Sequence, residues 1–200
     1  MTLSFDHEDA LPGPVAGVDE VGRGPWAGPV VAAAVILDRA AVPSGLNDSK
    51  RLTARRREAL DEAIRQTAQV GLGVCTVPEI DAMGVGRATL LAMRRAVAAL
   101  PTRPAGALID GTIAPDLPDG IAVRTLPRAD ALSPSVAAAS IVAKVHRDAE
   151  MTRLCEEHPG YAWASNKGYG TKDHAAGLDA HGVTVHHRRS FAPIARRVAR

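Results

Sequence analysis

The sequence predicts an α/β fold in which helices flank a mixed central sheet and a helical region follows at the C-terminal end. Three strand-like segments come early in the chain, and later strand-like segments are mixed with stretches of helical periodicity. With 200 residues, 46% of them hydrophobic, the chain is long enough to bury one sizeable core. No repeat or low-complexity segment interrupts it, so a single globular domain is expected.

The first two strands are expected to form an antiparallel pair. Residues 15–19 start with apolar residues typical of a buried strand, and Gly28–Leu37 is a longer apolar segment rich in β-branched residues. The short connection between them contains glycines and prolines, which is typical of a hairpin. Leu72–Val77 supplies a third strand.

Two amphipathic helices are expected on either side of the third strand. Thr53 can cap a helix that runs to about Val70. A second helix extends from about Arg87 to Leu100 with its large apolar residues on one face, and it stops at Pro101.

The second half of the chain predicts two short strands and one long helix. Ala107–Asp110 and Ile121–Thr125 are apolar or β-branched and are separated by a turn rich in proline and glycine. Ser135 is the expected N-cap of a helix that ends near Glu156. Residues 1–13 are expected to be a flexible leader before a single domain over residues 14–200.

Composition predicts a cytoplasmic protein that does not enter a membrane. The N-terminal residues are acidic and lack the apolar core of a signal peptide. The longest apolar run, Val30–Leu37, is far shorter than the ~20 residues that span a bilayer. Cys75 and Cys155 form no spaced motif and are expected to be free thiols in a reducing compartment.

Four carboxylates follow apolar segments and are expected to meet at one edge of the sheet: Asp19, Glu20, Asp110 and Asp130. Like charges gathered this closely raise one another's pKa unless a cation binds. Mg²⁺ or Mn²⁺ is the expected occupant because both prefer oxygen ligands. Two such ions can activate a water and stabilise the leaving oxygen of a phosphodiester.

Three alternatives remain open for these acids. An isolated acid at a strand end, such as Asp110, is often a solvated loop residue. Adjacent strand residues point to opposite faces, so Asp19 and Glu20 bind one ion through side chains only if the chain turns, which the following glycines permit. Asp148 rivals Asp130, since it shares a helix face with Ser140 and Lys144; it can equally pair with Lys144.

The aromatic residues indicate a nucleic-acid surface. Only six aromatic residues occur, yet Tyr161, Trp163 and Tyr169 fall within nine residues that also contain Lys167. Tyr161 and Trp163 are interpreted as core residues. Tyr169 lies between two glycines, which indicates exposure and suits stacking on a sugar or base.

Six sequence blocks occur in the order found in the ribonuclease HII family, the type 2 ribonuclease H enzymes, which the chain resembles over roughly residues 17–193. The blocks are Gly17–Pro29, Leu46–Lys50, Leu108–Gly111, Ala129–Asp130 with Ser135–Lys144, Lys167–Thr171 and His187–Phe191. Gly22-Arg23-Gly24 distinguishes the chain from the sister family, ribonuclease HIII, which carries lysine at the central position. Ala129 departs from the glycine of many members and leaves the assignment of Asp130 intact.

The resemblance implies a ribonuclease H-like catalytic domain with a metal-dependent endoribonuclease activity. Its substrates would be RNA–DNA hybrids and duplex DNA containing single ribonucleotides, cut on the 5′ side to leave 3′-hydroxyl and 5′-phosphate ends. It selects Asp130 over Asp148 as the fourth metal ligand and implies that Arg23 and its flanking glycines sense the ribose 2′-hydroxyl. Expected substrate contacts are Gly22, Arg23, Gly24, Asn47, Ser49, Lys50, Ser140, Lys144, Tyr169 and Arg188.

Two rival functions stay open: a DNA-only nuclease or resolvase on the same fold, and a non-catalytic module that binds hybrids. The four carboxylates count against the module, and the Gly-Arg-Gly segment counts against a DNA-only enzyme.

The net charge of +2 does not by itself indicate a nucleic-acid binder. Five arginines but no acid occur in residues 186–200; the final three are either phosphate contacts or a solvated tail, while His186 and His187 are expected at the surface. A monomer is expected, and protein partners cannot be derived.

Overall fold

The computed structural model describes residues 3–199, in which a five-stranded mixed sheet forms the centre of the fold. The strands lie in the order β3-β2-β1-β4-β5. Their bounds are Val15–Val21 (β1), Val30–Leu37 (β2), Ala68–Cys75 (β3), Gly106–Asp110 (β4) and Ala122–Leu126 (β5). The predicted antiparallel pairing of β1 and β2 is confirmed; β3 is antiparallel to β2, whereas β4 runs parallel to both β1 and β5.

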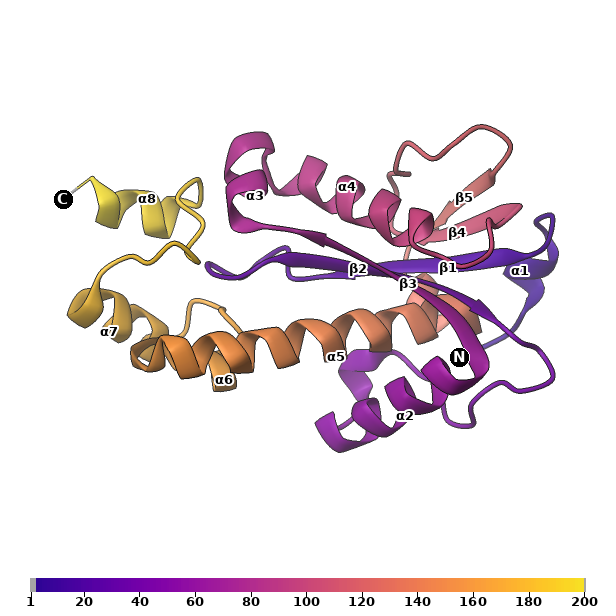
Figure 1. Cartoon of the computed structure of the whole chain (residues 1–200), viewed down its shortest axis with the longest axis horizontal. Coiled ribbons are helices and arrows are strands. Elements are labelled where there is room, and N and C mark those ends of the chain that lie inside the picture. Colours follow the sequence, from indigo (N-terminus) through magenta and orange to yellow (C-terminus); the bar gives the residue numbers. More distant parts are fainter. Residues whose placement is uncertain (1–2, 200) are drawn as a thin grey trace.

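The helices cover both faces of this sheet and extend it at one end (Figure 1). The α-helices are α1 (Asp6–Asp9), α2 (Ala54–Thr67), α3 (Val77–Met83), α4 (Val85–Ala98), α5 (Pro134–Glu157), α6 (Trp163–Asn166), α7 (Lys172–His181) and α8 (Ala192–Val198). Short 3-10 helices occur at Ser49–Arg51 (η1), Ala129–Ala131 (η2) and Pro159–Tyr161 (η3). Helix α4 packs on one face, and α5 with α2 packs on the other.

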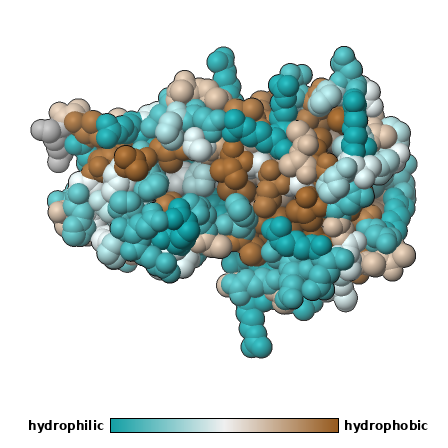
Figure 2. Space-filling view, in the orientation of Figure 1, coloured by the Kyte–Doolittle hydropathy of each residue, from teal (hydrophilic) through white to brown (hydrophobic). Residues whose placement is uncertain are grey.

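Alternation along the strands divides the core into these two layers. On β2, Ala32 and Ala34 belong to the layer under α4, and Val31 and Val35 belong to the layer under α5. The edge strand β3 is less covered, and Figure 2 shows hydrophobic side chains gathered along the middle of this face of the molecule.

Glycines let the helices approach the sheet backbone closely. A Cβ at Gly17 of β1 would lie 2.3 Å from the Val136 nitrogen of α5. A Cβ at Gly73 of β3 would lie 2.0 Å from the Ala92 carbonyl oxygen of α4. Both distances are shorter than any normal Cβ contact, so the main chain itself sets the layer spacing.

The N-terminal segment corrects one expectation. Residues 3–13 contain α1 and contact the start of α5: buried Glu8 accepts hydrogen bonds from the hydroxyls of Ser133 and Ser135 at 2.6 and 2.7 Å. These residues are therefore not a loose leader; residues 1 and 2 lie outside the described part. Ser133, rather than Ser135, caps α5, because its hydroxyl accepts from the Val136 N–H.

The C-terminal helical region has a small core of its own. Tyr161 and Trp163 are buried there with their rings stacked at 4.9 Å, which confirms that they are core residues. Over residues 3–199, no helix combines the length and the hydropathy needed to cross a membrane.

Candidate active site

Three acids lie at one edge of the sheet, two of them at the carboxyl ends of β1 and β4 and the third in η2. These neighbouring strands run parallel, with Val18 opposite Ile109, so Asp19 and Asp110 continue them in the same direction. Asp130 follows in η2, whose preceding residue Ala129 donates its N–H to Asp110 Oδ1 at 2.7 Å. The fold thus brings Asp19, Asp110 and Asp130, three of the four acids that the sequence predicted would meet, to this edge.

Asp19 is buried, with 5% of its surface exposed, as is Asp130. Burial, and then the negative charges of Glu20 and Asp110, raise the pKa of Asp19 well above its usual range. The hydrogen bond that Asp19 Oδ1 accepts from the Glu20 N–H at 2.7 Å, and the nearby Ser140 hydroxyl, act in the opposite direction. Burial also raises the pKa of Asp110, and the charge of Asp130 adds to that rise.

Glu20 leaves β1 on the opposite side from Asp19. The strand continues through Val21, so the turn that the glycines permit begins only at Gly22, where φ is +96°. Burial raises the pKa of Glu20 despite Arg23, whose guanidinium lies 3.5 Å from the carboxylate.

The donor set fits a hard divalent cation. Burial and mutual repulsion both penalise the charged carboxylates, and a cation with oxygen ligands relieves both penalties. The nearby basic side chains, Lys50 beside Asp130 at 3.4 Å and Arg23 beside Glu20, are largely exposed at the rim. Within residues 3–199, no three of these four acids have carboxylate oxygens that all lie within 4.8 Å of one another. The four carboxylates are therefore spread around an open site.

Asp148 lies apart from this acidic cluster. Its carboxylate accepts from Lys144 Nζ at 2.7 Å and is 3.9 Å from Arg57 Nη2. Asp148 and Lys144 therefore form an ion pair on α5, which is the alternative to metal binding that the sequence left open for Asp148.

The polar residues of the predicted Asn-Asp-Ser-Lys loop border Asp19 and Asp130. Ser49 is buried, and its hydroxyl lies 2.8 Å from that of Ser140. Asn47 bonds through its side chain to the Asp48 N–H, whereas Lys50 extends into solvent over Asp130. The two hydroxyls are thus buried near Asp19, and Lys50 is the exposed member of the loop.

The Gly22–Gly24 loop and Tyr169 lie against each other beside the acids. A Cβ at Gly24 would be 3.4 Å from Cε1 of the Tyr169 ring, and Tyr169 is 47% exposed. The Trp26 N–H donates to the Gly168 carbonyl oxygen at 2.8 Å and joins the two loops. An exposed aromatic ring therefore stands next to a main chain that lacks side-chain cover.

Arg188 does not lie at the surface, which corrects its expected role as a substrate contact. It is fully buried, and its guanidinium donates to the carbonyl oxygens of Gly22, Arg23, Gly28 and Pro29. Burial lowers its pKa to about 9. Arg188 thus holds the loop from the inside.

Arg147 is a second buried arginine, which the sequence reasoning did not single out. It donates to the carbonyl oxygens of Ala27, Pro29 and Lys167, and burial lowers its pKa to about 10. Its position in the sequence could have indicated that it is buried. Arg147 lies four residues before Met151 and seven before Leu154, on a helix face that is otherwise apolar.

His187 is also buried rather than exposed, and it belongs to a chain of hydrogen bonds that ends at Tyr169. His174 Nε2 accepts from Trp163 Nε1 at 3.1 Å, so its proton lies on Nδ1, 2.9 Å from the Tyr169 carbonyl oxygen. His187 then donates from Nε2 to His174 and accepts from Thr184 on Nδ1. Burial lowers the pKa of His187 to about 3, which keeps it neutral.

Comparisons with known proteins agree on one family. A sequence profile described as ribonuclease HII matches residues 16–194. A ribonuclease HII from Jannaschia sp. (strain CCS1) is 57% identical over 198 residues, which cover 98% of each chain. The crystal structure of ribonuclease H2 from Pyrococcus horikoshii OT3 superposes with a TM-score of 0.77 at 26% identity, covering 91% of this chain and 95% of that one.

A more distant structure shares the fold. A Bst-RNase HIII solved in complex with Mn²⁺ superposes with a TM-score of 0.72 at 24% identity, covering 92% of this chain and 69% of that one. The expected ribonuclease H-like fold is therefore confirmed.

Proposed function

Because the chain belongs to the ribonuclease HII family, and is thus a ribonuclease H that hydrolyses RNA in RNA–DNA hybrids, we propose that it also cuts duplex DNA at single ribonucleotides. The proposed cut falls on the 5′ side of the ribonucleotide and leaves 3′-hydroxyl and 5′-phosphate ends. The observation that supports this most strongly is the contact of the Gly22–Gly24 loop with Tyr169 beside the acidic cluster.

Asp19, Glu20, Asp110 and Asp130 are the proposed ligands of two Mg²⁺ or Mn²⁺ ions. When bound, such ions activate a water and stabilise the leaving oxygen of a phosphodiester. The fold relative solved with Mn²⁺ is in keeping with this choice of ion. The chain itself orients two of these acids: the Ala129 N–H donates to Asp110 at 2.7 Å, and the Glu20 N–H donates to Asp19 at 2.7 Å.

The selection of ribose is assigned to the loop and the tyrosine ring. Gly22 and Gly24 allow main-chain groups to approach a 2′-hydroxyl, the group that distinguishes RNA from DNA at one position. Tyr169 is proposed to stack on the deoxyribose that follows the ribonucleotide. Arg23 and Lys50 are exposed at the rim, where they can contact the phosphate backbone.

One substrate comparison tests this proposal. Three duplexes of the same sequence, with an all-RNA strand, one ribonucleotide or DNA alone, are incubated with the protein in Mg²⁺, in Mn²⁺ and in excess chelator. Metal-dependent cleavage of the first two, with product ends as stated, is the expected result. Cleavage of the hybrid alone would contradict the single-ribonucleotide activity, and cleavage of the all-DNA duplex would favour the DNA-nuclease alternative.

A further inference from the structure

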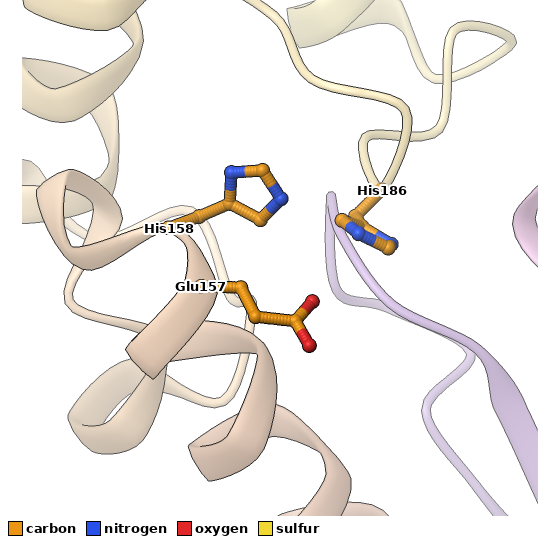
Figure 3. Close-up of side chains that lie close together, drawn as sticks. All are labelled: Glu157, His158 and His186. Carbon is orange, nitrogen blue, oxygen red and sulfur yellow. The ribbon is translucent and has the colours of Figure 1, made fainter.

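The C-terminal end of α5 carries a second group of ionisable side chains, far from the acidic cluster. Glu157 is the last residue of α5, His158 caps that helix, and His186 lies between α7 and α8. One ligand atom from each lies within 4.8 Å of the other two. Figure 3 shows the three side chains around one gap between the helix end and the His186 segment. From Ser140 at the acidic cluster to Glu157, α5 extends about 25 Å at 1.5 Å per residue.

The two imidazoles of this group have ring nitrogens to spare. Their ring centroids are 5.1 Å apart, with the planes inclined at 64°. Within residues 3–199, neither ring donates or accepts a hydrogen bond, in contrast to His174 and His187, whose nitrogens are all engaged. Four unassigned nitrogen atoms thus stand beside a carboxylate.

The local charge favours a cation. Arg153 bonds to both Glu150 and Glu157, so one guanidinium stands against two carboxylates and leaves a net negative charge. That bond uses Oε1 of Glu157 and leaves Oε2 available. The C-terminal end of a helix adds the negative end of its dipole. Trp163 packs edge-on against both rings and walls off one side.

We propose that Glu157, His158 and His186 form a transition-metal site for Zn²⁺ or an ion of similar preference. Two imidazole nitrogens and one carboxylate oxygen are a ligand set typical of Zn²⁺ and unlike the all-oxygen set that Mg²⁺ selects. A bound ion would tie the segment carrying His186 to α5. That segment also carries Arg188, which supports the Gly22–Gly24 loop, but the proposal does not depend on the proposed reaction.

Zn²⁺ titration by calorimetry tests the site directly. Excess Mg²⁺ is kept present so that the acidic cluster is occupied, and Co²⁺ replaces Zn²⁺ in a parallel experiment that reads visible absorption. The wild-type protein should bind one Zn²⁺ and show the intense bands of four-coordinate Co²⁺. His158→Gln and His186→Gln should each weaken Zn²⁺ binding by at least about tenfold, the scale on which even outer partners of a metal act.

His7→Gln is the matched control, since His7 lies on α1 at the other end of the molecule (Figure 1) and should leave Zn²⁺ binding unchanged. Thermal unfolding without added metal shows whether each variant is folded, and either folded histidine variant suffices for the comparison. The proposal would be overturned if the wild-type protein bound no Zn²⁺ under excess Mg²⁺. It would also be overturned if Zn²⁺ binding survived both histidine substitutions.

Discussion

Nη2 of Arg188 lies 2.6 Å from the carbonyl oxygen of Gly22, although the two residues are 166 positions apart in the chain. The same guanidinium reaches Arg23, Gly28 and Pro29, so one C-terminal side chain fixes both ends of the loop that follows β1. The shape of the proposed ribose-sensing loop therefore depends on the C-terminal region.

Replacement of this arginine by lysine should be costly. Arg188→Lys keeps the charge but removes the planar fork, and the carbonyl groups that lose their donors are buried. We expect a loss of about 2 kcal/mol or more in the free energy of unfolding, measured by urea titration. Arg189→Lys, at the adjacent exposed position, should change it by less than ~0.5 kcal/mol. Equal effects at both positions would show that the buried fork has no special role.

Asp110→Asn should separate stability from activity. Because folding raises the pKa of Asp110, its ionised form is disfavoured in the fold, and the neutral amide should leave the metal-free melting temperature unchanged or raise it. Turnover should fall by about a hundredfold or more, since one ligand charge is lost. Stabilisation by Mn²⁺ in thermal unfolding should shrink in parallel. Retained turnover in a folded variant would remove Asp110 from the proposed ligand set.

Substitution of Asp130 should affect cleavage, whereas substitution of Asp148 should affect only stability. Asp130 is buried beside Asp110, whereas Asp148 is paired with Lys144 and Arg57. Asp148→Asn should therefore retain cleavage and lose ~1 kcal/mol or less of stability. Asp130→Asn should lose cleavage while it remains folded by circular dichroism. The reverse pattern of rates would assign the fourth ligand to Asp148.

Tyr169 offers a test of substrate positioning. Tyr169→Ala should lower kcat/KM on a duplex with one ribonucleotide. The expected loss corresponds to about 1–3 kcal/mol of transition-state stabilisation, the contribution of one aromatic stacking contact. Tyr169→Phe keeps the ring and should restore most of that loss. If the alanine variant matches the wild type on this duplex, Tyr169 is only a surface residue.

Stability should fall in mild acid because of His187. Its folded-state pKa of about 3 lies below the ordinary value of 6.5, so below pH 6.5 the unfolded chain binds a proton that the folded chain excludes. This contribution to stability is complete above pH 6.5 and is lost as the pH falls towards about 3, by at most ~1.4 kcal/mol per unit. Urea midpoints at pH 7.5 and pH 5 measure it. The difference should be smaller in His187→Gln than in His7→Gln; identical differences would refute it.

The strands and longer helices could be predicted because their sequences satisfy local rules. Residues 15–19, for example, combine strand periodicity with an acidic end, and the observed β1 extends them by only two residues. The helix beginning after Thr53 ends sooner than expected, at Thr67, because the following residues pair with β2 from Ala68 onwards. Tertiary pairing there overrides a helical pattern that was locally acceptable.

The acids of the candidate site could be predicted from strand ends, whereas their supports could not. Arg188 and His187 look like surface residues in a basic segment, and only the packing of the C-terminal region against the loop after β1 makes them interior. Long-range hydrogen bonds of this kind have no local sequence signature. Glu8 is a further case, because its buried partners lie 125 and 127 residues away.

The contact of Gly17 with α5 determines how freely this protein can vary. Since no side chain separates β1 from the helix at that point, the span between Asp19 on the strand and Ser140 on the helix is fixed by two main chains. A change of side-chain volume that leaves this contact in place can alter stability without changing that span. At Gly17, by contrast, even one methyl group would push strand and helix apart, and with them Asp19 and Ser140.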